Sequence, residues 1–128
     1  MKYRLIGRLN SKEYIEKEFG ELNTDEVIVM DERLIHIQNR HLEDFELFEK
    51  YIKDVICFPD YIIKDHKNEN TVFMIKKIED TNLNAVVKVN VDKHISTYKN
   101  SIITFYRMRE KNLQKLLKKW SHLIIYKK

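Results

Sequence analysis

The chain has 128 residues and a formal net charge of +4, a length that suits one domain with one hydrophobic core. Its single cysteine, Cys57, excludes an internal disulfide and a cysteine-based zinc site, and its two glycines and one proline argue against long disordered linkers. No apolar run approaches the roughly 20 residues of a membrane span, and MKYRLIGRLN lacks the apolar stretch of a signal peptide. We therefore expect a cytoplasmic protein without a membrane partner.

Strand and helix patterns alternate in the first half of the chain. Short runs of strand-forming residues predict strands, and apolar residues that recur every three or four positions predict helices. Asp31 can cap one helix, and Pro59 ends the next. In chain order we expect a strand at 2–9, helical turns at 11–19, a strand at 26–30, a helix at 31–41 and a second helix through 45–56.

The second half changes to the alternating period of strands. We expect strands at 71–78, 84–92 and 101–107, a turn at 79–84, a basic amphipathic helix at 110–120, and a closing strand or extended tail at 122–128. This order predicts the α+β class, with N-terminal helices packed on an antiparallel β-sheet and a late basic helix. The cations between Arg107 and Lys128 form either a patch that attracts phosphates or a solvated helix face.

The predicted helix DERLIHIQNRH combines cations with imidazole chemistry. On a helix, Arg33, His36 and Arg40 fall within a sector of about 60°. The guanidiniums can hold a phosphate while the imidazole moves a proton, an arrangement that suits RNA cleavage without a metal. In such a reaction a base deprotonates the 2′-hydroxyl, an acid protonates the leaving oxygen, and cations stabilise the charged phosphorane. The aliphatic residues attach the helix to the body, namely Leu34, Ile35 and Ile37.

His41 lies about 140° from His36 on the same helix, at its end. Its position fits three roles: a C-terminal cap, a partly buried core histidine, or a second catalytic group, and the spacing alone favours the two structural roles. The five-residue spacing from His36 does not match the zinc-binding i, i+4 pattern, and no third ligand follows, so we expect neither a metal nor a cofactor.

The strand SIITFYR offers hydroxyl groups for the same phosphate. A period of two places Thr104 and Tyr106 on one face, where both can hydrogen-bond a phosphate and the tyrosine can stack on a base. Ser101 falls on the other face unless a bulge intervenes. Lys88, in the middle of VVKVNV, either supplies a cation to this face or points to solvent.

Four stretches occur together in this order: TDEVIVMDERLIHIQNRH, FPDYIIKDHKNENTVFMIK, YKNSIITFYRM and LIIYKK. In combination they resemble the phage-associated nuclease-fold domains of the barnase–EndoU–colicin–RelE-like superfamily, over residues 24–128. The resemblance implies a barnase/RelE-like α+β fold and metal-independent RNA cleavage. It makes residues 1–128 one nuclease-fold domain, with residues 1–23 as an N-terminal extension.

The resemblance also assigns roles by position. It matches His36 and His41 to the family's helix histidines, with Arg33 and Arg40 beside them. It matches Ser101 and Thr104 to the hydroxyl strand, Tyr106 to the aromatic residue that follows and Lys88 to a usual basic position. The chain departs from the pattern at three sites: Met30 replaces a frequent Thr, Leu42 a common Pro and Tyr106 a frequent Trp.

Two functions follow from these residues. The first is a metal-independent endoribonuclease, a phage or mobile-element toxin, that cleaves tRNA or mRNA through a 2′,3′-cyclic phosphate. His36, His41, Arg40, Thr104 and Tyr106 would be catalytic, and Arg33, Lys88, Ser101 and Arg107 would bind phosphate. Its cationic face predicts an acidic antitoxin or immunity protein as partner. The second is a catalytically inactive RNA- or protein-binding module on the same fold, associated with phage assembly.

Overall fold

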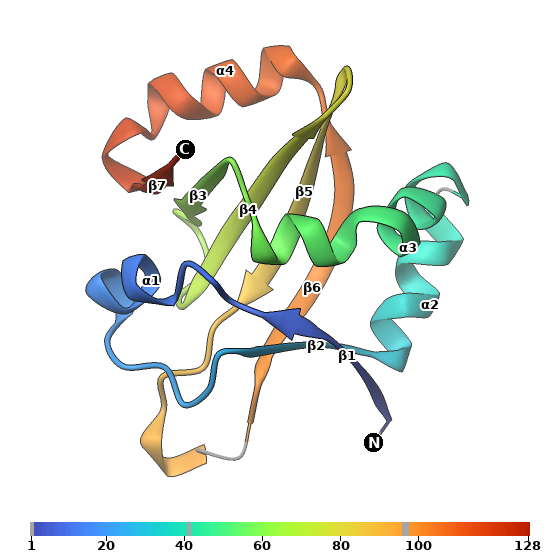
Figure 1. Ribbon diagram of the computed structural model, residues 1–128. Coiled ribbons are helices and arrows are strands. Elements are labelled where there is room, and N and C mark those ends of the chain that lie inside the picture. Colours follow the sequence, from blue (N-terminus) through green and yellow to red (C-terminus); the bar gives the residue numbers. More distant parts are fainter. Residues whose placement is uncertain (1, 41, 96–97) are drawn as a thin grey trace.

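The computed structural model describes residues 2–40, 42–95 and 98–128 (Figure 1). The strands are β1 (Tyr3–Arg8), β2 (Glu26–Met30), β3 (Tyr61–Lys64), β4 (Thr71–Ile78), β5 (Thr81–Lys88), β6 (Asn100–Met108) and β7 (Ile124–Lys127). The helices are α1 (Lys12–Phe19), α2 (Asp31–Arg40), α3 (Leu42–Cys57) and α4 (Glu110–Lys119). None of these helices is both long enough and apolar enough to span a membrane.

All seven strands join one sheet in the order β1-β2-β6-β5-β4-β3-β7. The predicted α+β class is confirmed, but the predicted arrangement is too simple in two respects. First, β1 and β2, which lie at the two predicted N-terminal strands, belong to the same sheet as the later strands. Second, β2 pairs with β6 in parallel, so the sheet is mixed. Neither feature can be inferred from local periodicity, because both depend on which distant strand becomes a neighbour.

The turn between β4 and β5 is shorter than predicted. The pairing of Ile78 with Thr81 leaves only Glu79 and Asp80 in the turn, and Glu79 has a φ of 54°. The two asparagines that suggested a longer turn, Asn82 and Asn84, are instead buried within β5. Asparagine is depleted in strands, so tertiary packing overrides its local preference here.

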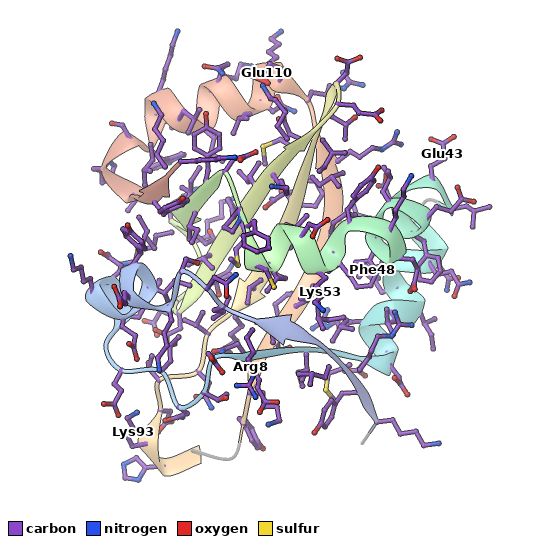
Figure 2. The ribbon with its side chains drawn as sticks, viewed as in Figure 1. Arg8, Glu43, Phe48, Lys53, Lys93 and Glu110 are labelled. Atoms are coloured by element: carbon purple, nitrogen blue, oxygen red, sulfur yellow. The ribbon has the colours of Figure 1, made fainter. Side chains whose placement is uncertain are left out.

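Helix α3 packs on one face of the sheet, which we call the front face. Figure 1 shows α3 crossing in front of the central strands. Its residues Phe48, Ile52, Val55 and Ile56 are buried in the main core, as the predicted apolar stripe requires. The Phe48 ring, labelled in Figure 2, meets Phe105 of β6 edge to face, with 5.3 Å between the ring centroids. Burial of a side chain of this size stabilises the fold by about 1.5–3 kcal/mol.

The opposite face, which we call the back face, is covered by α4 along part of its surface. Leu113 of α4 is buried in a second core cluster with Ile63, Ile75 and Met108. The helix lysines are exposed, and they are Lys111, Lys115, Lys118 and Lys119. Among the described residues, no buried helix side chain like Leu113 covers the back face near β1, β2 and the first half of β6, where Tyr3 and Leu5 are half exposed. This part of the sheet is a candidate binding surface.

Candidate nucleic-acid interface

A β-bulge decides which side chains of β6 share the back face. Val86 pairs with Thr104, Val87 with Ile102 and Lys88 with Ser101, so the register shifts by one residue between Val86 and Val87. Without the shift, Ser101 and Thr104 would point to opposite faces. The extra residue restores them to the same face, where Tyr106 and Lys88 also lie. The bulge anticipated as a condition for this grouping is therefore present.

Ser101, Thr104, Tyr106 and Lys88 form a row of side chains on the back face. Helix α2 brings a guanidinium to this row. β2 pairs with β6 only at Asn100 and Ser101, and α2 contacts β6 beyond that point. At the end of α2, Arg40 Nη1 lies 3.5 Å from Thr104 Oγ1, oriented to donate a hydrogen bond. This distance is long for a hydrogen bond, and contacts at catalytic sites often tighten only when substrate binds.

The attachment of α2 differs from the prediction at one residue. Ile37 is 1% exposed and Leu34 packs against the main core, as expected. Ile35 is 57% exposed and does not anchor the helix. It lies on the opposite side of the helix from Ile37, since two residues turn an α-helix by about 200°.

Beyond Thr104, a cavity of about 600 Å³ lies at the end of β6. Arg40, Tyr106, Arg107 and Arg109 supply its cationic and aromatic lining, and Asp44, Asp80 and Glu110 supply carboxylates. Three guanidiniums at one cavity can hold an anionic backbone. The structure thus brings three predicted residues together, since Arg40, Tyr106 and Arg107 all contribute.

The guanidinium of Arg107 is hydrogen-bonded to two carboxylates. Its Nε donates to Asp44 Oδ1 at 2.6 Å and its Nη2 to Glu43 Oε2 at 3.2 Å. Asp44 is a largely buried side chain of α3, so the pair joins β6 to the front-face helix. Glu43 marks the start of that helix in Figure 2. These two bonds make the Arg107 guanidinium less available for phosphate than the sequence predicted.

Lys88 and Ser101 line a second cavity, of about 390 Å³, at the other end of the row. Lys88 is exposed, and its side chain forms no hydrogen bond or ion pair with another described residue. An uncompensated ammonium next to a hydroxyl is suited to contact a phosphate group. Tyr98 and Lys99 also line this cavity.

The remaining predicted residues lie on α2 or outside the described chain. His36 is exposed one turn before Arg40, and Arg33 is half buried one further turn back. Neither side chain has a hydrogen bond to another described residue, and neither lines the two cavities. His41, the proposed second histidine, lies outside the described residues. The structure therefore unites Arg40, Thr104, Tyr106, Ser101 and Lys88, and leaves His36 at the margin.

Two ion pairs shape the electrostatics at the ends of the row. Hydrogen bonding to Glu26, at 2.6 Å, raises the pKa of Lys99 above its usual value of 10.5. Hydrogen bonds from Lys77, Gln114 and Asn82 lower the pKa of Glu110 to about 2. Both groups are therefore charged at neutral pH, and each charge is balanced by a neighbour.

Several lining residues were not anticipated, among them Tyr3, Tyr98, Lys99 and Asp80, whereas Arg109 belongs to the predicted cationic stretch from Arg107 onward. Tyr98 falls in the YKNS stretch, which offered a signal. Tyr3 offered none, because its place depends on the pairing of β1 with β2. Asp80 and Arg109 follow the ends of neighbouring strands, and only their pairing places them side by side.

A family model matches residues 4–115 of the chain. Its description is "phage-Barnase-EndoU-ColicinE5/D-RelE like nuclease 3". The match begins within β1 and ends within α4, so it includes all the residues of the row. No curated protein and no solved structure matches the chain.

Proposed function

Because this chain belongs to the phage-Barnase-EndoU-ColicinE5/D-RelE like nuclease 3 family, we propose that it is a metal-independent endoribonuclease. The observation that carries the proposal is the row on the back face: Arg40 beside Thr104, in line with Ser101, Tyr106 and Lys88. Hydroxyls along β6, with cations beside them from α2 and β5, match the spaced phosphates of a single nucleic-acid strand.

In the proposed reaction, a base removes the proton of a 2′-hydroxyl and O2′ attacks the adjacent phosphorus. The bond from phosphorus to O5′ breaks, O5′ takes a proton from an acid, and a 2′,3′-cyclic phosphate remains. His36 is one of these two groups and His41 the other. Arg40 stabilises the charge that develops on the phosphorane, and Thr104 positions the phosphate.

The other residues bind the strand on each side of the reacting phosphate. Lys88 and Ser101 contact one neighbouring phosphate, and Arg33 contacts another from α2. Tyr106 positions the phosphate or stacks on a base. The exposed lysines of α4 attract more distant phosphates.

The test uses purified protein, a labelled single-stranded RNA and EDTA. We expect cleavage that leaves a 2′,3′-cyclic phosphate end, and we expect loss of cleavage in His36→Ala. His94→Ala is the matched control, because His94 is also exposed but lies in a separate 3₁₀ turn (Lys93–Ile95). A requirement for divalent metal, or cleavage of an RNA with 2′-deoxyribose at the scission position, would contradict the proposed chemistry.

One observation favours the second function, a binding module without catalysis. The imidazole of His36 has no hydrogen-bonded partner among the described residues, and a general base is normally oriented by one. Expression in bacteria separates the two functions. An active ribonuclease arrests growth unless its inhibitor is present, and His36→Ala relieves the arrest. Harmless accumulation of the unaltered protein would favour the binding module.

As a toxin, the protein would act on tRNA or mRNA of its host and would be held inactive by an acidic antitoxin or immunity protein. The net charge of +4 and the cationic row support such a partner. We expect co-expression with an acidic inhibitor protein to restore growth and to give a complex that dissociates at high salt.

A further inference from the structure

A third cavity, of about 400 Å³, adjoins the row on the back face between β1, β2 and β6. Its floor is apolar and consists of Ile28 and Met30 of β2. Two tyrosines stand at its walls: Tyr3, 50% exposed, and Tyr98, 62% exposed. Half or more of each tyrosine stays in contact with solvent, so both rings are accessible to a ligand.

The charges at this cavity argue against a phosphate as its occupant. Lys99 lines it, but its ammonium is 2.6 Å from the Glu26 carboxylate, and both side chains are largely buried. Glu32, from the first turn of α2, also lines the cavity, and its carboxylate has no ion pair with a described residue. A cavity with an apolar floor, aromatic walls and an acceptor at its rim suits a flat heterocycle that donates hydrogen bonds.

Ser101 connects this cavity to the phosphate-binding row. It lines both this cavity and the one that contains Lys88, together with Tyr98 and Lys99. A nucleotide can therefore place its phosphate next to Lys88 and its base between the tyrosines. Proteins that bind single strands combine cations along the backbone with aromatic rings on which the bases stack.

We propose that Tyr3 and Tyr98 form a nucleobase-binding subsite for single-stranded RNA, with Ile28 and Met30 beneath the base and Glu32 accepting a hydrogen bond from its edge. The subsite rests on the proposed function, because it gives the substrate as a single strand with an unpaired base next to the row. A base within a duplex cannot enter, since both of its faces are already stacked.

The experiment measures binding without cleavage. Fluorescence anisotropy gives the Kd for short 2′-O-methyl oligonucleotides, whose blocked 2′-oxygen cannot attack phosphorus. Tyr98→Ala weakens binding about 5- to 100-fold, the range for loss of one stacked base at tenfold per 1.4 kcal/mol. Tyr98→Phe retains the ring and binds nearly as well as the unaltered protein. Phe58→Ala is the matched control, because Phe58 is also 62% exposed but lies away from the row.

Abasic oligonucleotides show whether the tyrosine contacts a base. At one position in the strand, removal of the base weakens binding by the unaltered protein but no longer weakens binding by Tyr98→Ala. This loss of additivity is the mark of a direct contact. Equal Kd values for Tyr98→Ala and the unaltered protein would overturn the subsite and leave these rings for a protein partner.

The result is separable from that of the proposed function. Cleavage of RNA combined with no effect of Tyr98→Ala on binding would overturn the subsite alone. Tyrosine-dependent binding of a base without any cleavage would support the subsite and contradict catalysis.

Discussion

Arg40 Nη1 lies 3.5 Å from Thr104 Oγ1, although the two residues are 64 positions apart in the chain. The contact joins the end of α2 to the middle of β6. It places a guanidinium next to a part of the described back face where hydroxyls lie near Lys88, whose side chain has no ion pair with a described residue. The chemistry proposed for the protein depends on this contact more than on any other.

Replacement of Arg40 tests the contact directly. We expect Arg40→Ala to lower kcat/KM for RNA cleavage by about 10²- to 10³-fold, the usual cost of losing one group that stabilises a charged transition state. Thr104→Val is expected to lower it less, because the hydroxyl positions rather than neutralises the phosphate. Arg4→Ala is the control, since Arg4 pairs with Glu49 of α3 on the front face. Equal losses for Arg4→Ala and Arg40→Ala would indicate a general effect of charge.

Lys88 is predicted to contact one phosphate of bound RNA. Lys88→Ala should then weaken binding for all sequences and reduce the slope of log K against log salt by about 0.7. Lys53→Ala, on the front-face helix α3 (Figure 2), should change neither quantity. A salt titration of oligonucleotide binding measures both. An unchanged slope for Lys88→Ala would show that this lysine points to solvent.

Arg107 has a structural role in addition to lining its cavity. Arg107→Ala leaves the largely buried Asp44 carboxylate without its partner, and we expect a loss of about 2 kcal/mol in the free energy of unfolding. Asp44→Asn should remove most of that penalty, and urea denaturation of the single and double variants measures the coupling. Arg109→Ala, which breaks no ion pair with a described residue, should change stability by less than about 0.5 kcal/mol. If the losses of Arg107→Ala and Asp44→Asn add up in the double variant, Arg107 and Asp44 are not coupled.

The lowered pKa of Glu110 predicts that the folded protein loses stability in acid. Its pKa is lowered to about 2 in the folded protein by Lys77, Gln114 and Asn82, against 4.5 for an ordinary glutamate. A lowered carboxylate pKa contributes stability above the unfolded value, and this contribution disappears as the pH falls from about 4.5 to about 2. The urea midpoint of the unaltered protein should therefore be higher than that of Glu110→Gln at pH 6. At pH 3 the two midpoints should lie closer together.

Glu46→Gln is the control for the acid effect, because Glu46 is exposed on α3 and has no ion pair among the described residues. Its midpoints should follow those of the unaltered protein at both pH values. A constant difference between Glu110→Gln and the unaltered protein, independent of pH, would point to packing instead of charge.

Much of the local structure followed from patterns in the chain. The period of α3 identified Phe48, Ile52, Val55 and Ile56 as core, and all four are buried. Helix geometry grouped Arg33, His36 and Arg40, and it correctly placed Ile37 toward the body. The prediction went wrong where polar residues stand inside a buried strand, as Asn82 and Asn84 do. Local propensity reflects the environment in which a residue type is usually found. Asn82 and Asn84 are buried inside a sheet, which is unusual for asparagine.

The sequence by itself determined the elements and the kinds of groups that they carry, because periodicity and residue chemistry are local properties. Only the tertiary structure decided which of those groups meet. One extra residue in β6 brings Ser101 onto the face of Thr104, and a buried carboxylate binds Arg107. The pairing of β1, β2 and β6 likewise places Tyr3 in the cavity with Tyr98. Strand register and strand order arise from contacts between distant segments, and a shift of one residue exchanges the faces of every side chain that follows.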